Sequence, residues 1–229
     1  MFKVLTIERE FGSGANSVAQ VLSRRLGWKL LDQSLTQEIA HIAGVDVEAA
    51  RRCDERRDSL MHRLGKVFWR GSFERSLQIG GSDVFDADRM VECVKEVVEN
   101  AASAGNCIIV GRGAPYFLRN HEDAFHVFLY APKEEKIRRI RCWGKTEAEA
   151  EELVTSVDRD RASFVRHYFG KEWPNRHLYH LMINTIIGDE LVADLVQRGM
   201  ESAARARQLP KAVDSILKFP GGSPATTRK

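Results

Sequence analysis

Short apolar runs alternate with long amphipathic patterns along this chain, and the alternation constrains the fold more than any other feature. The runs FKVLTI, WKLLD, CIIVG, AFHVFLY and LMINT have the length and composition of buried or extended strands. Strands that alternate with helices form a parallel sheet with helices on both faces, so the sequence predicts a three-layer α/β/α domain. The expected helices are residues 17–27, 34–44, 46–64, 86–105, 133–141, 147–168 and 190–207.

The chain of 229 residues is long enough for one sizeable domain. We expect a single domain over residues 1–208. A flexible tail over 209–229 is predicted, because that segment loses its periodicity and gathers Pro, Gly and Thr. Four glycines between Gly65 and Ser82 interrupt the helical pattern and predict a mobile connection there.

Composition disfavours several functional classes. The formal net charge is +3, from 35 basic and 32 acidic residues, which by itself is too small to argue for nucleic-acid or membrane-surface binding. Four cysteines without a Cys-x-x-Cys pair fit a reducing cytoplasm. The N-terminus enters a strand without a signal-peptide pattern, and no apolar stretch approaches the roughly 20 residues of a spanning helix. The expected location is therefore the cytoplasm.

The stretch EREFGSGANS, residues 8–17, joins the first expected strand to the first expected helix. In an open α/β sheet, ligands bind beyond the carboxyl ends of the strands. Gly12 and Gly14 lie there, where glycines let backbone N–H groups turn toward an anion and a helix N-terminus adds a favourable dipole. Ser17 lies where a Mg²⁺-binding hydroxyl often lies. These features favour a phosphate-binding loop.

The same stretch departs from the strict phosphate-loop pattern G-x-x-x-x-G-K-[ST]. Arg9 occupies the position of the first glycine, Ala15 that of the lysine, and Asn16 that of the first hydroxyl. The alternative interpretation is an ordinary glycine-rich turn in which Asn16 or Ser17 caps the helix. From this segment alone, both interpretations stay open.

Charged residues elsewhere favour the phosphate interpretation. Arg112 follows a strand and lies between two glycines in VGRGAP, where a guanidinium is a fixed fork for phosphate. Asp32 ends the second strand on the same side, basic residues gather between Lys133 and Lys145, and Asp158 and Arg161 share a helical face. Phosphoryl transfer needs such positioned cations. The ordinary alternatives are a surface-loop arginine, a helix N-cap and a solvated basic face.

Over about residues 3 to 188, the chain resembles the cytidylate kinase-like family, a branch of the nucleoside monophosphate kinases within the P-loop fold. The blocks that carry the resemblance are EREFGSGANSVA, LLDQSL, CDERRDSL, DADRMVE, GNCIIVGRGAPYFLR, HVFLYAPKEEKIRRI, VDRDRASFVRHYF and INT, in that order. The resemblance implies a five-stranded parallel sheet. It also implies a monophosphate-binding insertion over about 32–105 and a mobile lid over about 139–173.

The resemblance also implies which residues bind ATP. The phosphate loop is matched by Gly12, Ser13 and Gly14, with Ala15 and Asn16 after them and Ser17 at its end, where Ser17 is also the expected Mg²⁺ ligand. The turn near the adenine of the donor is matched by Asn184 and Thr185.

On the acceptor side, Asp32 matches the acid that opens the monophosphate site, and Arg112 matches the arginine that holds the phosphate of the acceptor. Arg139 matches the arginine early in the lid helix, and Asp158 and Arg161 match the acid and arginine of the lid. The expected catalytic residues are Arg112, Arg139 and Arg161. The expected acceptor-binding residues are Asp32, Arg112, Asp158 and Arg161.

The expected function is transfer of the γ-phosphoryl group of ATP, with Mg²⁺, to a nucleoside monophosphate such as CMP or dCMP. Arg139 or Arg161 of a closed lid would then supply the charge that the loop lacks at Ala15. The alternative is a nucleotide-binding regulatory module with little or no turnover, which the missing lysine favours. A metal site at His177 and His180 is disfavoured, since the two residues resemble surface or capping histidines.

Overall fold

The computed structural model describes residues 1–31 and 87–208. Several sequence predictions lie outside the described residues. They are Asp32, the expected helices over 34–44 and 46–64, the connection over 65–82, and the tail over 209–229. Most of the expected insertion over 32–105 lies outside as well.

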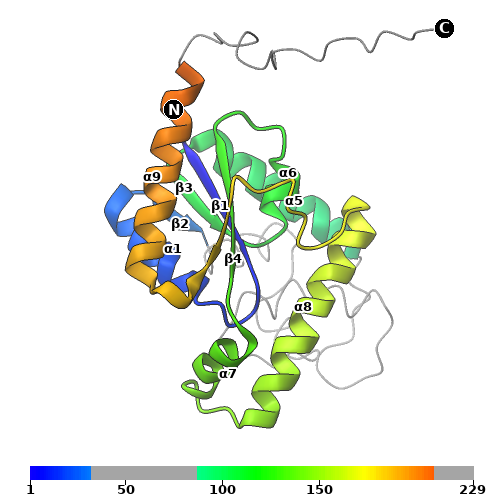
Figure 1. Cartoon of the computed structure of the whole chain (residues 1–229). Coiled ribbons are helices and arrows are strands. Elements are labelled where there is room, and N and C mark those ends of the chain that lie inside the picture. The colour runs from blue at the N-terminus through cyan, green and yellow to red at the C-terminus, as the bar shows by residue number, and fades with distance from the viewer. Residues whose placement is uncertain (32–86, 209–229) are drawn as a thin grey trace, which may run out of the picture.

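A five-stranded sheet forms the centre of the described structure (Figure 1). Its order is β2-β3-β1-β4-β5, and every neighbouring pair is parallel. The predicted parallel sheet of five strands is confirmed. The strands are β1 (Val4–Arg9), β2 (Lys29–Leu31), β3 (Cys107–Val110), β4 (Ala124–Tyr130) and β5 (Leu181–Asn184).

Helices connect the strands close to the predicted bounds, because helical spacing of apolar residues is a local signal. A four-residue helix, α6, follows the GRG segment and was not predicted from the sequence. The helices are α1 (Ala15–Leu26), α5 (Ala87–Ala104), α6 (Ala114–Phe117), α7 (Lys133–Arg141), α8 (Glu147–Phe169) and α9 (Asp189–Gln208), with a 3₁₀ turn at Thr185–Ile187. None of the described helices is long and apolar enough to cross a membrane.

Local chemistry sets the ends of α8. Its N-terminus carries a reciprocal capping box, in which the Thr146 hydroxyl accepts from the Glu149 N–H and the Glu149 carboxylate accepts from the Thr146 N–H. Gly170 ends the helix in the left-handed conformation. These signals flank 23 helical residues, which is long enough for α8 to reach from the sheet out past its carboxyl end (Figure 1).

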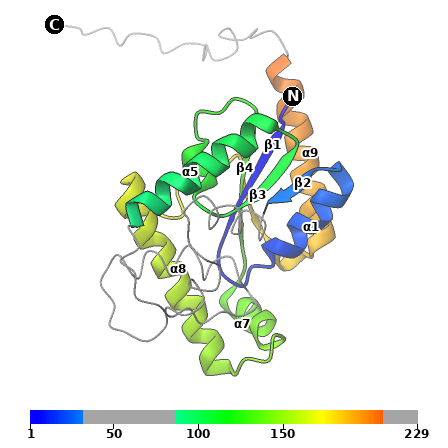
Figure 2. The same ribbon diagram turned by 180° about the vertical axis from the view of Figure 1, so that it is seen from behind.

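Two apolar cores cover the two faces of the sheet. Alternate residues of β1 point to opposite faces: Leu5 and Ile7 join the core with α1 and α9, and Val4 joins the core with α5, α6 and α8. Figure 1 shows α1 and α9 on one side of the sheet, and Figure 2 shows α5 on the other. The predicted three-layer arrangement is therefore confirmed.

A third, smaller core lies beyond the carboxyl end of the sheet. It joins Phe11, from the segment after β1, to Ile140 of α7 and to Ala150, Val154 and Val157 of α8. The helices α7 and α8 form a hairpin below the sheet in Figure 1. This hairpin brings its charged side chains to the end of the sheet where parallel α/β folds bind ligands.

Candidate nucleotide site

The segment between β1 and α1 forms a compact loop built on two left-handed glycines. Gly12 has φ 75°, and Gly14 has φ 80° and is the N-cap of α1. The helix begins at Ala15, two residues before its predicted start, and no side chain caps it. Capping by Asn16 or Ser17, the alternative left open by the sequence, is therefore wrong. Glycine replaces the side-chain cap because only glycine adopts this turn without strain.

The loop offers its backbone N–H groups. The Phe11 N–H donates to Asp158, and the Ser13 N–H donates to the carbonyl of Glu10. Between described residues, no hydrogen bond engages the N–H groups of the other loop and first-turn residues, Gly12, Gly14, Ala15 and Asn16. The Ser13 hydroxyl oxygen is fully buried and has no hydrogen-bond partner within the described ranges. Donors at a helix N-terminus are suited to an anion such as phosphate.

A phosphate loop carries a charged lysine at position 15, but in this chain the residue is the uncharged Ala15. Ala15 is buried at 1% exposure and packs in the core with Val18 and α9. Ser17 is exposed on the first turn of α1. Any positive charge at the loop must therefore come from other elements.

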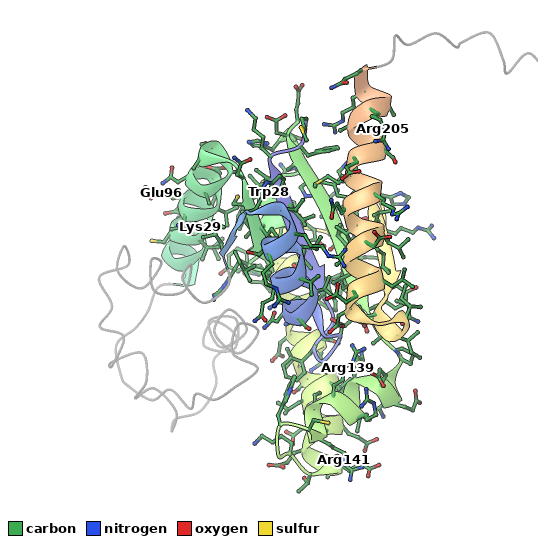
Figure 3. All side chains as sticks on the ribbon, turned by 90° about the vertical axis from the view of Figure 1, so that its left-hand side faces the viewer. Trp28, Lys29, Glu96, Arg139, Arg141 and Arg205 are labelled. Atoms are coloured by element: carbon green, nitrogen blue, oxygen red, sulfur yellow. The ribbon has the colours of Figure 1, made fainter. Side chains whose placement is uncertain are left out.

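Arg139 of α7 supplies one such charge. Its Nη1 donates to the carbonyl oxygen of Ser13 at 2.5 Å and to the hydroxyl of Thr185 at 2.9 Å. The Thr185 hydroxyl donates in turn to the same Ser13 carbonyl at 2.6 Å. In Figure 3, Arg139 lies between α7 and the end of the sheet. The loop, α7 and the turn after β5 thus meet at one carbonyl oxygen.

Glu135, one turn earlier in α7, orients this guanidinium. Its Oε1 accepts from Nε of Arg139 at 2.8 Å. Hydrogen bonds from Arg138, and the charge of Arg139, lower the pKa of Glu135 to about 2. The carboxylate therefore stays ionised at neutral pH and keeps Arg139 directed toward the loop.

Asp158 of α8 is the centre of a second charged cluster. Its Oδ1 accepts from the Phe11 N–H at 2.8 Å and from Nη1 of Arg161 at 3.2 Å. Its Oδ2 lies 3.5 Å from Nζ of Lys136, which also contacts Glu10 at 2.8 Å. Burial raises the pKa of Asp158, and the charges and N–H donors around it oppose that shift.

Arg161 extends this cluster to β1, since its Nη1 donates to the carbonyl of Arg9 at 2.8 Å. The sequence predicted Asp158 and Arg161 as acceptor-binding lid residues. The structure brings both against the backbone of the segment that begins the loop.

Arg112 lies on the neighbouring strand end, after β3. Gly111, Arg112 and Gly113 have φ values of 71°, 62° and 65°, so three successive residues are left-handed. Arg112 is the only one of them with a side chain, and it is 8% exposed. A buried arginine held in a costly backbone conformation indicates a functional position.

The sequence interpretation missed Arg9 as a site residue, although it lies in the same region. Its guanidinium covers Gly111 so closely that a Cβ at residue 111 would lie 1.8 Å from Nη1. Lys136 was also missed, because it is one of several basic residues between Lys133 and Lys145 and nothing in the sequence distinguishes it from the others. The sequence feature that could have identified Arg9 is the charged Glu8-Arg9 pair at the end of an apolar strand. In the structure, both residues are buried, with exposed fractions of 4% and 6%.

The turn after β5 was predicted to lie near adenine. Asn184 caps its 3₁₀ turn by accepting from the Ile186 N–H at 3.1 Å, and Thr185 is buried against the loop. Thus the structure brings Gly12–Asn16, Arg139, Asp158, Arg161 and Thr185 together, with Arg112 on the adjacent strand end.

The structure places His180, one of the two histidines considered for a metal site, against β4. The ring of His180 stacks on Phe125, and its Nδ1 accepts from the backbone N–H of His126. Within residues 1–31 and 87–208, no group of three or more His, Cys, Asp or Glu side chains is arranged to hold a metal ion.

Comparisons with curated proteins and with solved structures find proteins similar to this chain. A curated relative, a cytidylate kinase from Shewanella oneidensis, is 30% identical over 102 residues, which are 44% of this chain and 42% of the relative. The chain thus spans less than half the length of the curated relatives it matches. Among solved structures, an uncharacterized protein from Eubacterium ventriosum has a TM-score of 0.63 at 17% identity, covering 87% of this chain and 99% of that protein. A gluconokinase from Sinorhizobium meliloti 1021 has a TM-score of 0.51 at 9% identity, covering 90% and 95%.

At these identities, the two solved structures show a shared fold. The sequence carries more specific information, because a family model matches residues 4–186. That range includes both clusters around the loop and the glycine-flanked Arg112. The chain belongs to the cytidylate kinase-like family.

Proposed function

We propose that this protein transfers the γ-phosphoryl group of ATP to a nucleoside monophosphate, with CMP and dCMP as the first candidates. The observation that carries the proposal is the set of four N–H groups, from Gly12, Gly14, Ala15 and Asn16, that no described residue engages at the N-terminus of α1. Membership of the family and the cytidylate kinase relative support this choice of acceptor.

In this proposal, the loop from Gly12 to Ser17 binds the triphosphate through its backbone, and Asn184 and Thr185 border the adenine. Arg139 and Arg161 contribute positive charge from α7 and α8, where they already contact the loop segment. Mg²⁺, held by the phosphates and the Ser17 hydroxyl, would neutralise charge on the phosphoryl oxygens. Positioned cations are the main protein contribution to such a reaction.

Arg112 is the proposed ligand of the acceptor phosphate. The other proposed acceptor-binding residues are Asp158, Arg161 and Asp32, of which Asp32 lies outside the described residues. An oxygen of that phosphate forms a bond to the γ-phosphorus as the bond to the β,γ-bridging oxygen breaks, which yields ADP and a nucleoside diphosphate. No side-chain nucleophile is required, because the acceptor attacks directly.

A phosphoryl-transfer assay tests the proposal. The protein is incubated with ATP and Mg²⁺ and, separately, with CMP, dCMP, UMP, AMP and gluconate, and both ADP and the phosphorylated acceptor are quantified. We expect acceptor-dependent ADP formation with a pyrimidine monophosphate. Formation of ADP at the same rate with and without every acceptor would overturn it.

The second candidate is a nucleotide-binding regulatory module, which the absence of a lysine at position 15 favours. It predicts ATP binding by calorimetry without product from any acceptor. The cytoplasm stays the predicted location for either function.

A further inference from the structure

The phosphate loop has one large apolar side chain, and that side chain points away from the sheet. Phe11 is 5% exposed and belongs to neither of the cores that cover the sheet. Its partners are Ile140 of α7 and Ala150, Val154 and Val157 of α8. Its ring also lies edge-on to that of Trp143, with the two ring centroids 6.0 Å apart. Every other member of this third core belongs to the α7–α8 hairpin.

The backbone at Phe11 is held by the same hairpin. Its N–H donates to Asp158 of α8 at 2.8 Å. The next residue, Gly12, lies directly on α7: a Cβ there would be 3.1 Å from Cδ1 of Ile140 and 3.2 Å from the carbonyl oxygen of Lys136. The hairpin therefore fixes residue 11 by side chain and backbone, immediately before the first unengaged N–H group of the loop.

This arrangement matters because the loop has no lysine. Without that charge, anion binding depends on N–H groups whose directions must be fixed in advance. A change at residue 11 turns the peptide that carries the Gly12 N–H, and misplacement of about 1 Å at a binding group can cost on the order of a hundredfold in rate. The hairpin is the element that fixes those directions.

We propose that Phe11 and Asp158 are positioning residues through which the α7–α8 hairpin keeps the phosphate loop in its anion-binding shape. This inference rests on the proposed function in assuming that the loop binds phosphate. By thermodynamic reciprocity, an anion in the loop also orders the hairpin. Trp143, in contact with Phe11, reports that coupling.

The test compares Phe11→Ala with Phe164→Ala as a matched control. Phe164 is also 5% exposed and lies on α8, but it packs in the core that α5, α6 and α8 form with the sheet, and not in the third core with Phe11. Calorimetry measures binding of ATP and of inorganic tripolyphosphate. We expect Phe11→Ala to weaken both about tenfold or more. Phe164→Ala should leave both dissociation constants within about twofold of wild type while lowering thermal stability.

A conservative pair separates positioning from mere packing. Phe11→Leu keeps an apolar side chain in the third core and should restore most of the affinity. Asp158→Asn keeps an acceptor for the Phe11 N–H and should bind anions better than Asp158→Ala. Equal dissociation constants for Phe11→Ala, Phe164→Ala and wild type would overturn the inference.

Two further readouts keep this inference distinct from the proposed function. Amide hydrogen exchange at Glu10, Phe11 and Ser13, whose N–H groups are hydrogen-bonded, should be faster in Phe11→Ala than in Phe164→Ala, in proteins without nucleotide. Trp143 fluorescence should change when tripolyphosphate is added to wild type and not to Phe11→Ala. If wild type binds no ATP, the proposed function fails, and the exchange comparison still decides the inference: equal exchange in both variants refutes it.

Discussion

The guanidinium of Arg139 donates to the carbonyl oxygen of Ser13 at 2.5 Å, although 126 residues separate them in the chain. Thr185 donates to the same oxygen from the turn after β5. A charged hydrogen bond to this carbonyl fixes the peptide that links Ser13 to Gly14, and no described residue engages the Gly14 N–H. Arg139 therefore contacts the loop already, rather than arriving only when a lid closes.

Removing this contact should weaken ATP binding itself. We expect Arg139→Ala to raise the ATP dissociation constant by roughly ten- to a hundredfold, because a hydrogen bond to a charged group contributes about 1.5–3 kcal/mol. The control is Arg141→Ala, in the same helix, because the Arg141 side chain is 57% exposed and pairs with Glu147. Exposed pairs contribute about 0–1 kcal/mol, so this control should bind ATP normally. Equal affinity in the two variants would contradict the assignment of Arg139.

Gly14 should tolerate no side chain. A Cβ there would lie 2.8 Å from Nη1 of Arg139, in addition to the strain of φ 80°. We expect Gly14→Ala to displace the guanidinium and weaken ATP binding about tenfold or more. Gly27→Ala is the control, because Gly27 has φ 66° and nothing within 4 Å of its Cβ position.

The control should lose about 1–2 kcal/mol of stability and keep its ATP affinity. Adding Gly14→Ala to Arg139→Ala should then weaken binding less than it does in wild type, which a double-mutant cycle measures. Additive effects would show that Gly14 acts independently of Arg139.

Substitution of Arg112 should weaken binding of the acceptor and leave binding of the donor, ATP, unchanged. Loss of a charge-assisted phosphate contact predicts a rise of about ten- to a hundredfold in the KM of the acceptor for Arg112→Ala. ATP affinity should be unchanged. Arg112→Lys should recover part of the effect only, since lysine lacks the planar fork. Arg119→Ala removes a nearby exposed arginine, whose Nη1 donates to the Tyr116 carbonyl, and serves as the control. An unchanged acceptor KM in folded Arg112→Ala protein would refute the acceptor site.

Stability should fall in mild acid because of His126. Burial, and the nearby His180, lower the pKa of His126 to about 4, and its Nδ1 lies 2.7 Å from the hydroxyl of Thr6. The native state thus favours the neutral ring. Its stabilising contribution is complete above the unfolded pKa of about 6.5 and is lost as pH falls toward 4. Between pH 7 and pH 4.5, the free energy of unfolding should drop by about 2–3 kcal/mol from this group.

Urea unfolding of wild type and His126→Asn at both pH values isolates this contribution. Carboxylates also titrate in the window, but they do so in both proteins. We expect the loss in wild type to exceed the loss in His126→Asn by the amount given above. Equal losses would mean that another group carries the pH dependence.

Local patterns predicted the elements that are built locally. The bounds of α7 match the expected 133–141, since the spacing of its residues is a property of the segment itself. The glycine-flanked Arg112 was also recognisable, because Gly-Arg-Gly after a buried strand combines a backbone signal with a charge. The family blocks also predicted the parallel sheet of five strands, which is confirmed, and a phosphate-binding role for the loop, which stays a prediction.

Only the tertiary structure decided what each of these residues contacts. Phe11 is one aromatic side chain in a polar loop, and nothing near it in the sequence indicates Ile140 or Val154 as partners. Asp158 was predicted to bind the acceptor, which stays a prediction, and its hydrogen bond from the loop backbone could not be inferred from the sequence. Ala15 stands where a phosphate loop has lysine, and the structure shows that it packs in the core. The positive charges that contact the loop segment come from Arg139 of α7 and Arg161 of α8. The physical reason is that the strand order β2-β3-β1-β4-β5 places β1 beside β4 and its hairpin, and contacts across more than a hundred residues leave no periodic trace in the sequence.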